Sequence, residues 1–166
     1  MNRVLVAGVG NVFLGDDAFG VEVVRELLLR PLAPEVTVRD FGTRGLDLAY
    51  MLAEGFDALL LVDTVQRGHT PGTLSVIEPD FSAPTEPEDF VGPAHGVDPC
   101  RVAGLVQALG GTMPITRLVG CEPLSFGSDE APMFDLSEPV RAAVTRALPL
   151  VEQVLLELSG EASGDA

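Results

Sequence analysis

Two carboxylates and one imidazole in this sequence could hold a metal ion. Asp17 and Asp63 each follow an apolar run, and His95 lies in a long loop later in the chain. Such a set suits a divalent ion of the Ni, Zn, Mn or Fe kind and leaves coordination positions open. Asp17, Asp63 and His95 are therefore candidate metal ligands. Asp40, which also ends an apolar-alternating run, belongs to the same candidate site.

A second interpretation of these residues stays open. Asp17 could cap the helix that follows it, and His95 could be an exposed loop side chain. Chain order permits a shared site but does not require one. Asp16 is expected to cap the same helix rather than to orient a neighbour. His69, within a turn of small and polar residues, is expected to be exposed and not a ligand.

Other chemistries fit the motifs poorly. Gly8 and Gly10 supply the first two glycines of the G-x-G-x-x-G dinucleotide motif, but Phe13 stands at the third. Ser125 lies in a segment that resembles G-x-S-x-G, yet Pro123 replaces the first glycine of that nucleophile turn. A dinucleotide site and a serine nucleophile are therefore not expected.

Alternating strand and helix patterns must position the candidate residues. Apolar or alternating runs predict strands over 3–7, 36–40, 58–62, 73–78 and 115–121. Helical spacing and start signals predict helices over 19–30, 46–54, 98–109 and 137–158. The first three strands alternate with helices, as in parallel βαβ units, so their carboxyl ends meet at one edge. That edge collects Asp17, Asp40 and Asp63.

The later elements complete the predicted sheet. The 64–72 connection has no helical pattern, so the 73–78 strand is expected to run antiparallel to the 58–62 strand. The 79–97 loop must then return to the carboxyl edge, and it brings His95 there. The predicted fold is α/β: a mostly parallel five-stranded twisted sheet with one antiparallel strand and helices on both faces. It forms a single domain over 1–158, followed by a flexible tail over 159–166.

Size, charge and cysteine usage bound the function. The chain has 166 residues, of which 46% are apolar, enough for one domain with a sizeable core. A net charge of −15 argues against a nucleic-acid partner. We expect a cytoplasmic protein without membrane insertion, because no apolar run could span a bilayer and no signal peptide is visible. Cys100 and Cys121 are expected to be reduced; a Cys100–His95 nucleophile lacks a group that would lower the thiol pKa.

Several motifs, taken jointly, resemble one known family. They are Gly8-x-Gly10-Asn11-x-x-Leu14-x-Asp16-Asp17-x-x-Gly20, Asp40-x-Gly42-Thr43-x-Gly45, Val62-Asp63, Pro71-Gly72-Thr73, His95 and Gly120-x-Glu122-Pro123. The chain resembles the hydrogenase maturation endopeptidases, the HybD-like proteases of peptidase family M52, over about its whole length. Phe41 stands where relatives commonly have a glycine, and Asp17 where they often have glutamate.

The resemblance implies an activity and roles for individual residues. It implies an endopeptidase that removes a C-terminal extension from the large-subunit precursor of a [NiFe]-hydrogenase after nickel insertion. Asp17, Asp63 and His95 would contact nickel that the precursor supplies, although Zn or Cd could occupy the same site. Asp40 or Asp16 would act as a base or positioning group.

Two alternatives to this processing enzyme remain. One is a non-catalytic nickel checkpoint, a chaperone that binds the precursor through the same ligands. The other is a free-standing metallohydrolase with its own zinc.

Overall fold

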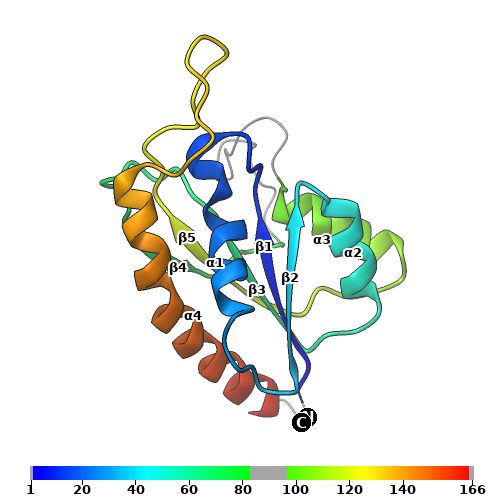
Figure 1. Ribbon diagram of the computed structural model, residues 1–166. Helices are drawn as coiled ribbons and strands as arrows, with labels where there is room; N and C mark the ends of the chain where they lie inside the picture. Colours follow the sequence, from blue (N-terminus) through cyan, green and yellow to red (C-terminus); the bar gives the residue numbers. More distant parts are fainter. Residues whose placement is uncertain (1, 83–96, 165–166) are drawn as a thin grey trace.

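The protein is a three-layer α/β domain, described here by a computed structural model that covers residues 2–82 and 97–164. Its sheet has five strands in the order β2-β1-β3-β5-β4 (Figure 1). The strands are β1 (Val4–Val9), β2 (Val36–Gly42), β3 (Ala58–Thr64), β4 (Leu74–Ile77) and β5 (Ile115–Cys121). All neighbouring strands pair in parallel except β4 and β5, which are antiparallel. The predicted fold class is confirmed.

Helices cover both faces of the sheet (Figure 1). α1 (Phe19–Leu27) and α4 (Glu138–Gly164) pack on one face, whereas α2 (Gly45–Ala53) and α3 (Pro99–Ala108) pack on the other. A short 3-10 helix, η1 (Gly15–Ala18), precedes α1. Each face therefore has its own apolar core, with the sheet between them.

The inner strand β1 is covered by helices on both faces, which explains its continuous apolar run. Val4 and Val6 belong to the core under α1 and α4, whereas Leu5 and Ala7 belong to the core under α2 and α3. Successive side chains point to opposite faces of a strand, so a strand covered on both faces needs apolar residues at every position.

Local capping signals set the ends of α2 and α3. The Asp98 carboxylate accepts a 2.9 Å hydrogen bond from the Cys100 amide, and Pro99 fills the first helical position. Gly55 and Gly110 follow α2 and α3 with φ of 103° and 83°, values that favour glycine. Asp98 therefore caps α3, at the start of the helix predicted over 98–109.

The direction of β4 is confirmed, and one helix end differs from the prediction. β4 runs antiparallel to β3, as predicted; its hydrogen-bonded neighbour, which was not predicted, is β5, so β4 forms the edge of the sheet. α4 continues to Gly164, past the predicted end at residue 158. The flexibility of the 159–166 tail stays a prediction. Of the helices in the described ranges, none is long and apolar enough to cross a membrane.

Candidate active site

Asp17 and Asp63 meet at the carboxyl edge of the sheet, and Thr64 links them. Asp17 lies in η1, just beyond β1, and Asp63 is the second-last residue of the adjacent strand β3. The Thr64 amide donates to Asp63 Oδ1 at 2.7 Å, and the Thr64 hydroxyl donates a long 3.4 Å bond to Asp17 Oδ1. One residue thus contacts both carboxylates, which places the two predicted ligands in one site.

Glycines allow the turn that carries Asp17 to lie directly on the strand ends. A Cβ at Gly10 would stand 1.8 Å from the Asp17 carbonyl oxygen, and one at Gly20 would stand 2.0 Å from that of Val62. The turn also orients the Asp17 side chain, because the Asn11 amide donates to Asp17 Oδ2 at 2.7 Å. The glycine-rich run therefore serves close backbone packing around Asp17.

Burial raises the pKa values of both carboxylates, and the charge of Asp17 adds to the shift of Asp63. The pKa of Asp63 is raised well above its usual range, first by burial and then by the charge of Asp17, against the hydrogen bonds of Thr64. Burial also raises the pKa of Asp17, which the bonds from Asn11 and Thr64 partly offset. A bound cation would relieve this excess of negative charge. Neighbouring carboxylates with such shifts are typical of a functional site.

The irregular end of β2, residues 40–42, brings Asp40 to the same edge, and we call these residues the Asp40 turn. The Gly42 amide donates to Asp40 Oδ1 at 2.8 Å, and the Gly42 carbonyl accepts a 2.9 Å bond from the Gly10 amide. Gly42 adopts a φ of 54°, whereas Phe41 is buried in the core under α2. This turn therefore accommodates phenylalanine, because the left-handed backbone falls on the next residue.

His95 lies outside the described residues, so its predicted place beside Asp63 is not tested. Within residues 2–82 and 97–164, no group of three or more His, Cys, Asp or Glu side chains could hold a metal ion. The described part of the predicted metal site therefore consists of Asp17 and Asp63. Val97, where the described chain resumes, is buried and has side-chain atoms 3.7 Å from a Cβ built on Gly45, after the Asp40 turn.

Comparisons with known proteins identify the family. The family model described as hydrogenase maturation protease (HycI) matches residues 21–154 of this chain. The chain belongs to the hydrogenase maturation proteases. It is 34% identical to hydrogenase expression/formation protein HupD of Bradyrhizobium diazoefficiens, over 94% of this chain and 79% of that protein. It is 32% identical to the hydrogenase 2 maturation protease of Escherichia coli, over 94% and 90% of the two chains.

Solved structures of maturation proteases share the fold. The endopeptidase HybD from Escherichia coli aligns with a TM-score of 0.74 at 29% identity, covering 93% of each chain. HycI from Thermococcus kodakarensis aligns with a TM-score of 0.73 at 25% identity, covering 93% of this chain and 92% of that one. The resemblance found in the motifs is thus confirmed for the family and the fold.

Asp16 does not cap α1 in this maturation protease, so that prediction was wrong. Its carboxylate is fully buried and accepts four hydrogen bonds, from the amides of Leu124, Ser125 and Ser137 and from the Ser137 hydroxyl, at 2.7–3.1 Å. These donors come from the segment between β5 and α4. Asp16 therefore holds that segment onto the turn that carries Asp17.

The structure assigns contacts or protonation properties to three further residues, Glu122, Cys121 and Thr64, for which the sequence alone gave no role. Glu122 is buried, and its carboxylate accepts bonds from the amides of Arg67 and Gly68, which fixes the turn after β3. Burial and the charge of nearby Asp16 raise the pKa of the Cys121 thiol to about 12, so this cysteine is no nucleophile at neutral pH. Thr64, the link between the two carboxylates, was identifiable only as the residue after Asp63.

Proposed function

We propose that this maturation protease removes the C-terminal extension of a [NiFe]-hydrogenase large-subunit precursor, in the cytoplasm, after nickel has been inserted. The observation that carries the proposal is the pair of carboxylates, Asp17 and Asp63, with raised pKa values beside one threonine. An arriving cation would gain two oxygen ligands whose charge is otherwise poorly compensated. The family supports the protease activity.

In this proposal the nickel belongs to the substrate. The precursor presents it, and Asp17, Asp63 and His95 complete its coordination, so that only loaded precursor engages the site. Val97, two residues after His95 in the chain, packs close to Gly45, which follows the Asp40 turn. A cation beside the scissile bond polarises its carbonyl or a water molecule.

Asp40 is the better candidate for the base. Asp16 is fully buried and already accepts four hydrogen bonds, so it has no free position for a water proton. Among the described residues, only the Gly42 amide donates to the Asp40 side chain, and Asp40 is half-buried. Its carboxylate would take the proton of the attacking water and return it to the leaving amine as the peptide C–N bond breaks.

Mass spectrometry of a co-expressed precursor tests the proposal. With nickel in the medium, the precursor should lose its C-terminal extension; without nickel it should stay intact. Asp63→Asn and His95→Ala should leave at least about 99% of the loaded precursor uncut, as expected when a cation ligand is removed. His69→Ala is the matched control, because His69 is exposed in the turn before β4, and it should cleave normally.

Three results would contradict the proposal. Full cleavage by both Asp63→Asn and His95→Ala would show that the predicted ligands are not needed. Stable binding of the loaded precursor without cleavage by the wild-type protein would favour the checkpoint chaperone. Stoichiometric zinc in the purified protein would favour the metallohydrolase.

A further inference from the structure

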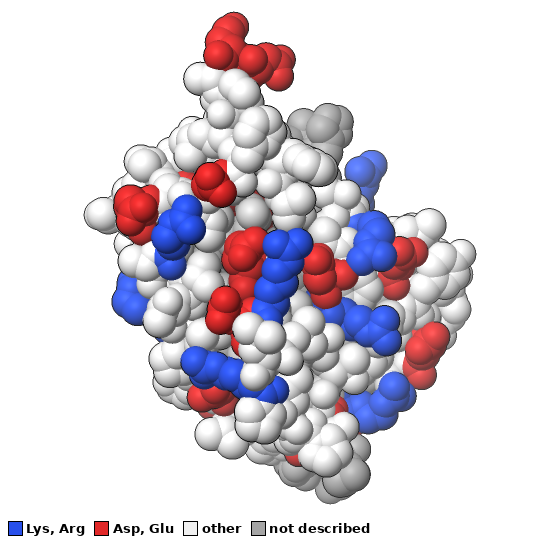
Figure 2. Space-filling model, viewed as in Figure 1, with Lys and Arg blue, Asp and Glu red and all other residues white. Residues whose placement is uncertain are grey.

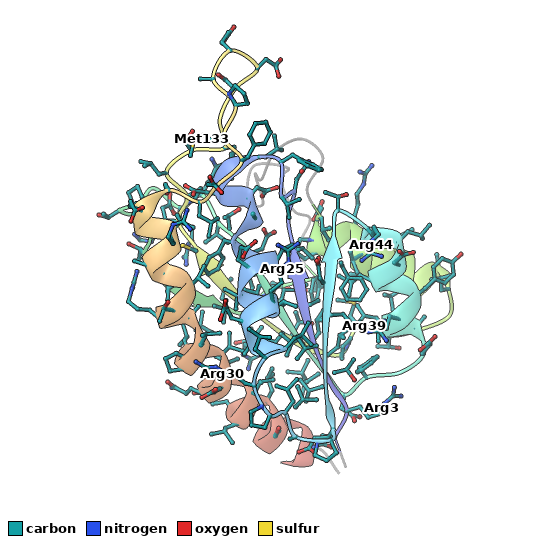
Figure 3. All side chains as sticks on the ribbon, in the orientation of Figure 1. Arg3, Arg25, Arg30, Arg39, Arg44 and Met133 are labelled. Atoms are coloured by element: carbon teal, nitrogen blue, oxygen red, sulfur yellow. The ribbon has the colours of Figure 1, made fainter. Side chains whose placement is uncertain are left out.

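The segment between β5 and α4 is fastened to the candidate active site at several points. This segment, residues 124–137, is called the 124–137 loop below. Besides the four bonds to the Asp16 carboxylate, the Gly15 amide donates to the Met133 carbonyl at 2.8 Å, and the Asp16 amide to the Ser125 carbonyl at 3.1 Å. Figure 3 shows Met133 at the base of this protruding loop, above the start of α1. The base of the loop is therefore fixed next to Asp17.

Large apolar side chains are exposed around this attachment. Phe13, Leu124 and Phe134 are 69%, 59% and 66% exposed. Each lies one or two residues from a hydrogen bond between the loop and η1, namely those of Gly15, Ser125 and Met133. Two phenylalanines and a leucine held in water beside an active site are typical of an interaction surface. We call these three residues the docking patch.

The loop also carries negative charge. Asp129, Glu130 and Asp135 are exposed, and residues 124–137 contain no Lys, Arg or His. Figure 2 shows the acidic side chains at the tip of the protruding loop, away from any basic group on that face. A partner surface with Lys or Arg beside apolar residues would complement both features.

We infer that the docking patch, together with the acidic tip, binds a segment of the hydrogenase precursor that carries apolar side chains next to Lys or Arg. This inference rests on the proposed function and names the substrate surface that the protease recognises outside its metal site. The six hydrogen bonds that fix the base of the loop preorganise the patch relative to Asp17. A precursor docked on it lies beside Asp17 and Asp63.

Charge argues against other occupants of the patch. A second copy of this chain would carry the same acidic tip and the same net charge of −15, so the two copies would repel each other. An anionic lipid surface would be repelled for the same reason. A basic and apolar protein segment is the occupant that the described residues favour.

The inference is tested by measuring binding and cleavage of the nickel-loaded large-subunit precursor. The precursor comes from the same organism as the protease. The double variant Leu124→Ser/Phe134→Ser should bind this precursor about tenfold more weakly or worse, as expected for buried aromatic anchors. KM should rise similarly while kcat stays within about twofold, because docking contacts are made equally in the ground and transition states. The control Leu29→Ser/Leu156→Ser removes apolar residues that are 81% and 77% exposed near the far ends of α1 and α4, and it should leave KM unchanged.

Reversing the charge of the acidic tip tests the inference independently. Asp129→Lys/Glu130→Lys should weaken binding and reduce its dependence on salt, whereas Glu26→Lys/Glu54→Lys, an equal charge change at exposed sites on α1 and after α2, should do neither. Circular dichroism checks that each variant is folded.

The outcomes separate the two proposals. Unchanged KM in both Leu124→Ser/Phe134→Ser and Asp129→Lys/Glu130→Lys, with normal cleavage, would overturn the docking surface and leave the protease function standing. A precursor that neither binds nor is cut by the wild-type protein would overturn both. A dimer of the protease alone that Leu124→Ser/Phe134→Ser abolishes would assign the patch to a second copy and overturn the inference.

Discussion

A carboxylate that is to bind a cation must be placed where its charge is poorly compensated beforehand. Asp63 meets this condition, since burial and the nearby charge of Asp17 both oppose its ionisation. The cost falls on the stability of the free protein, because the fold holds two carboxylates together in a site of limited solvent contact. Function and stability should therefore be opposed at this residue.

Replacing Asp63 with asparagine should stabilise the protein at neutral pH while it abolishes processing. The pKa of Asp63 is raised in the fold, so the protonated form favours folding, and that contribution is lost as pH rises through the raised pKa. Asparagine is uncharged at every pH and is close in shape to the protonated form of Asp63. We expect the free energy of unfolding to rise by about 1 kcal/mol at pH 7.5, or roughly 2–4 °C in Tm.

Thermal unfolding of the wild type and of Asp63→Asn from pH 4 to pH 8 checks how the difference in Tm depends on pH. The Tm advantage of Asp63→Asn should shrink as pH falls toward 4, where the wild-type carboxyl is protonated. Asp47→Asn, at a side chain that is 57% exposed, is the control and should change Tm little. An advantage that grows toward acid pH would contradict the proposed cost.

Removing the Asp16 carboxylate should destabilise the protein strongly. Asp16→Ala leaves the buried amide of Ser137 and those of Leu124 and Ser125 without their acceptor. Each unsatisfied donor costs about 1–3 kcal/mol when water cannot replace the bond, so a total near 3 kcal/mol is expected. Ser137→Ala removes a single hydroxyl bond and should cost about 1 kcal/mol. Urea unfolding measures both values, and equal losses in the two variants would refute the role of Asp16.

At the scale of elements, close packing of α1 against the sheet depends on Gly20. A methyl group there would stand 2.0 Å from the Val62 carbonyl oxygen and 2.6 Å from that of Val9, so α1 would have to move away from β1 and β3. Gly20→Ala should therefore cost about 2 kcal/mol or more, as an overpacking change. Gly104→Ala in α3 has nothing within 4 Å of the new Cβ, and it should stabilise by about 0.5–1 kcal/mol through helix propensity.

Calorimetry of these two glycine variants gives opposite signs if backbone contact is the reason for Gly20. Two losses of similar size would instead indicate that any alanine at these glycines is unfavourable. Close packing at Gly20 keeps η1, with Asp17, near the strand ends. Gly20→Ala should therefore also weaken processing of the precursor.

Local signals in the sequence predicted most elements, because each is encoded by residues close together in the chain. The 115–121 strand has the predicted bounds, and Asp98 with Pro99 marks the start of α3. The pairing of β4 with β5 was missed, because a turn pattern gives strand direction but not the neighbour across a long connection.

The partner of Asp16 was missed for a related reason. Its hydrogen-bond donors lie 108 to 121 positions away in the chain. Asp17 and Asp63 were predictable together only because the topology of parallel βαβ units brings strand ends to one edge. His95 stays a prediction.

The whole molecule concentrates its proposed chemistry at the carboxyl edge of the sheet. The Asp17–Asp63 pair, the Asp40 turn and the docking patch all lie there. An apolar groove of about 290 Å³, lined by residues such as Leu27, Leu155 and Leu156, lies between the end of α1, the start of β2 and α4. Nothing in the structure shows what covers this groove, and the proposed function does not use it.

Charge is the other property of the whole molecule, and it should make stability depend on salt. The chain has 25 acidic and 10 basic residues. Surface ion pairs such as Arg25–Glu22 and Arg30–Glu152, at 2.9 Å, contribute little. Repulsion among the unbalanced acids therefore dominates, and raising NaCl from about 0.01 M to 0.15 M shortens the Debye length from about 30 Å to about 8 Å.

We expect Tm to rise by a few degrees over this salt range, corresponding to about 1 kcal/mol at roughly 2–4 °C per kcal/mol. Glu26→Lys/Glu54→Lys changes the net charge from −15 to −15 + 4 = −11 and should show a smaller rise, because less repulsion remains to be screened. Differential scanning calorimetry at fixed pH measures both slopes. A Tm that falls with NaCl would mean that ion pairs outweigh repulsion, and an equal rise in the two proteins would mean that salt acts through something other than net charge.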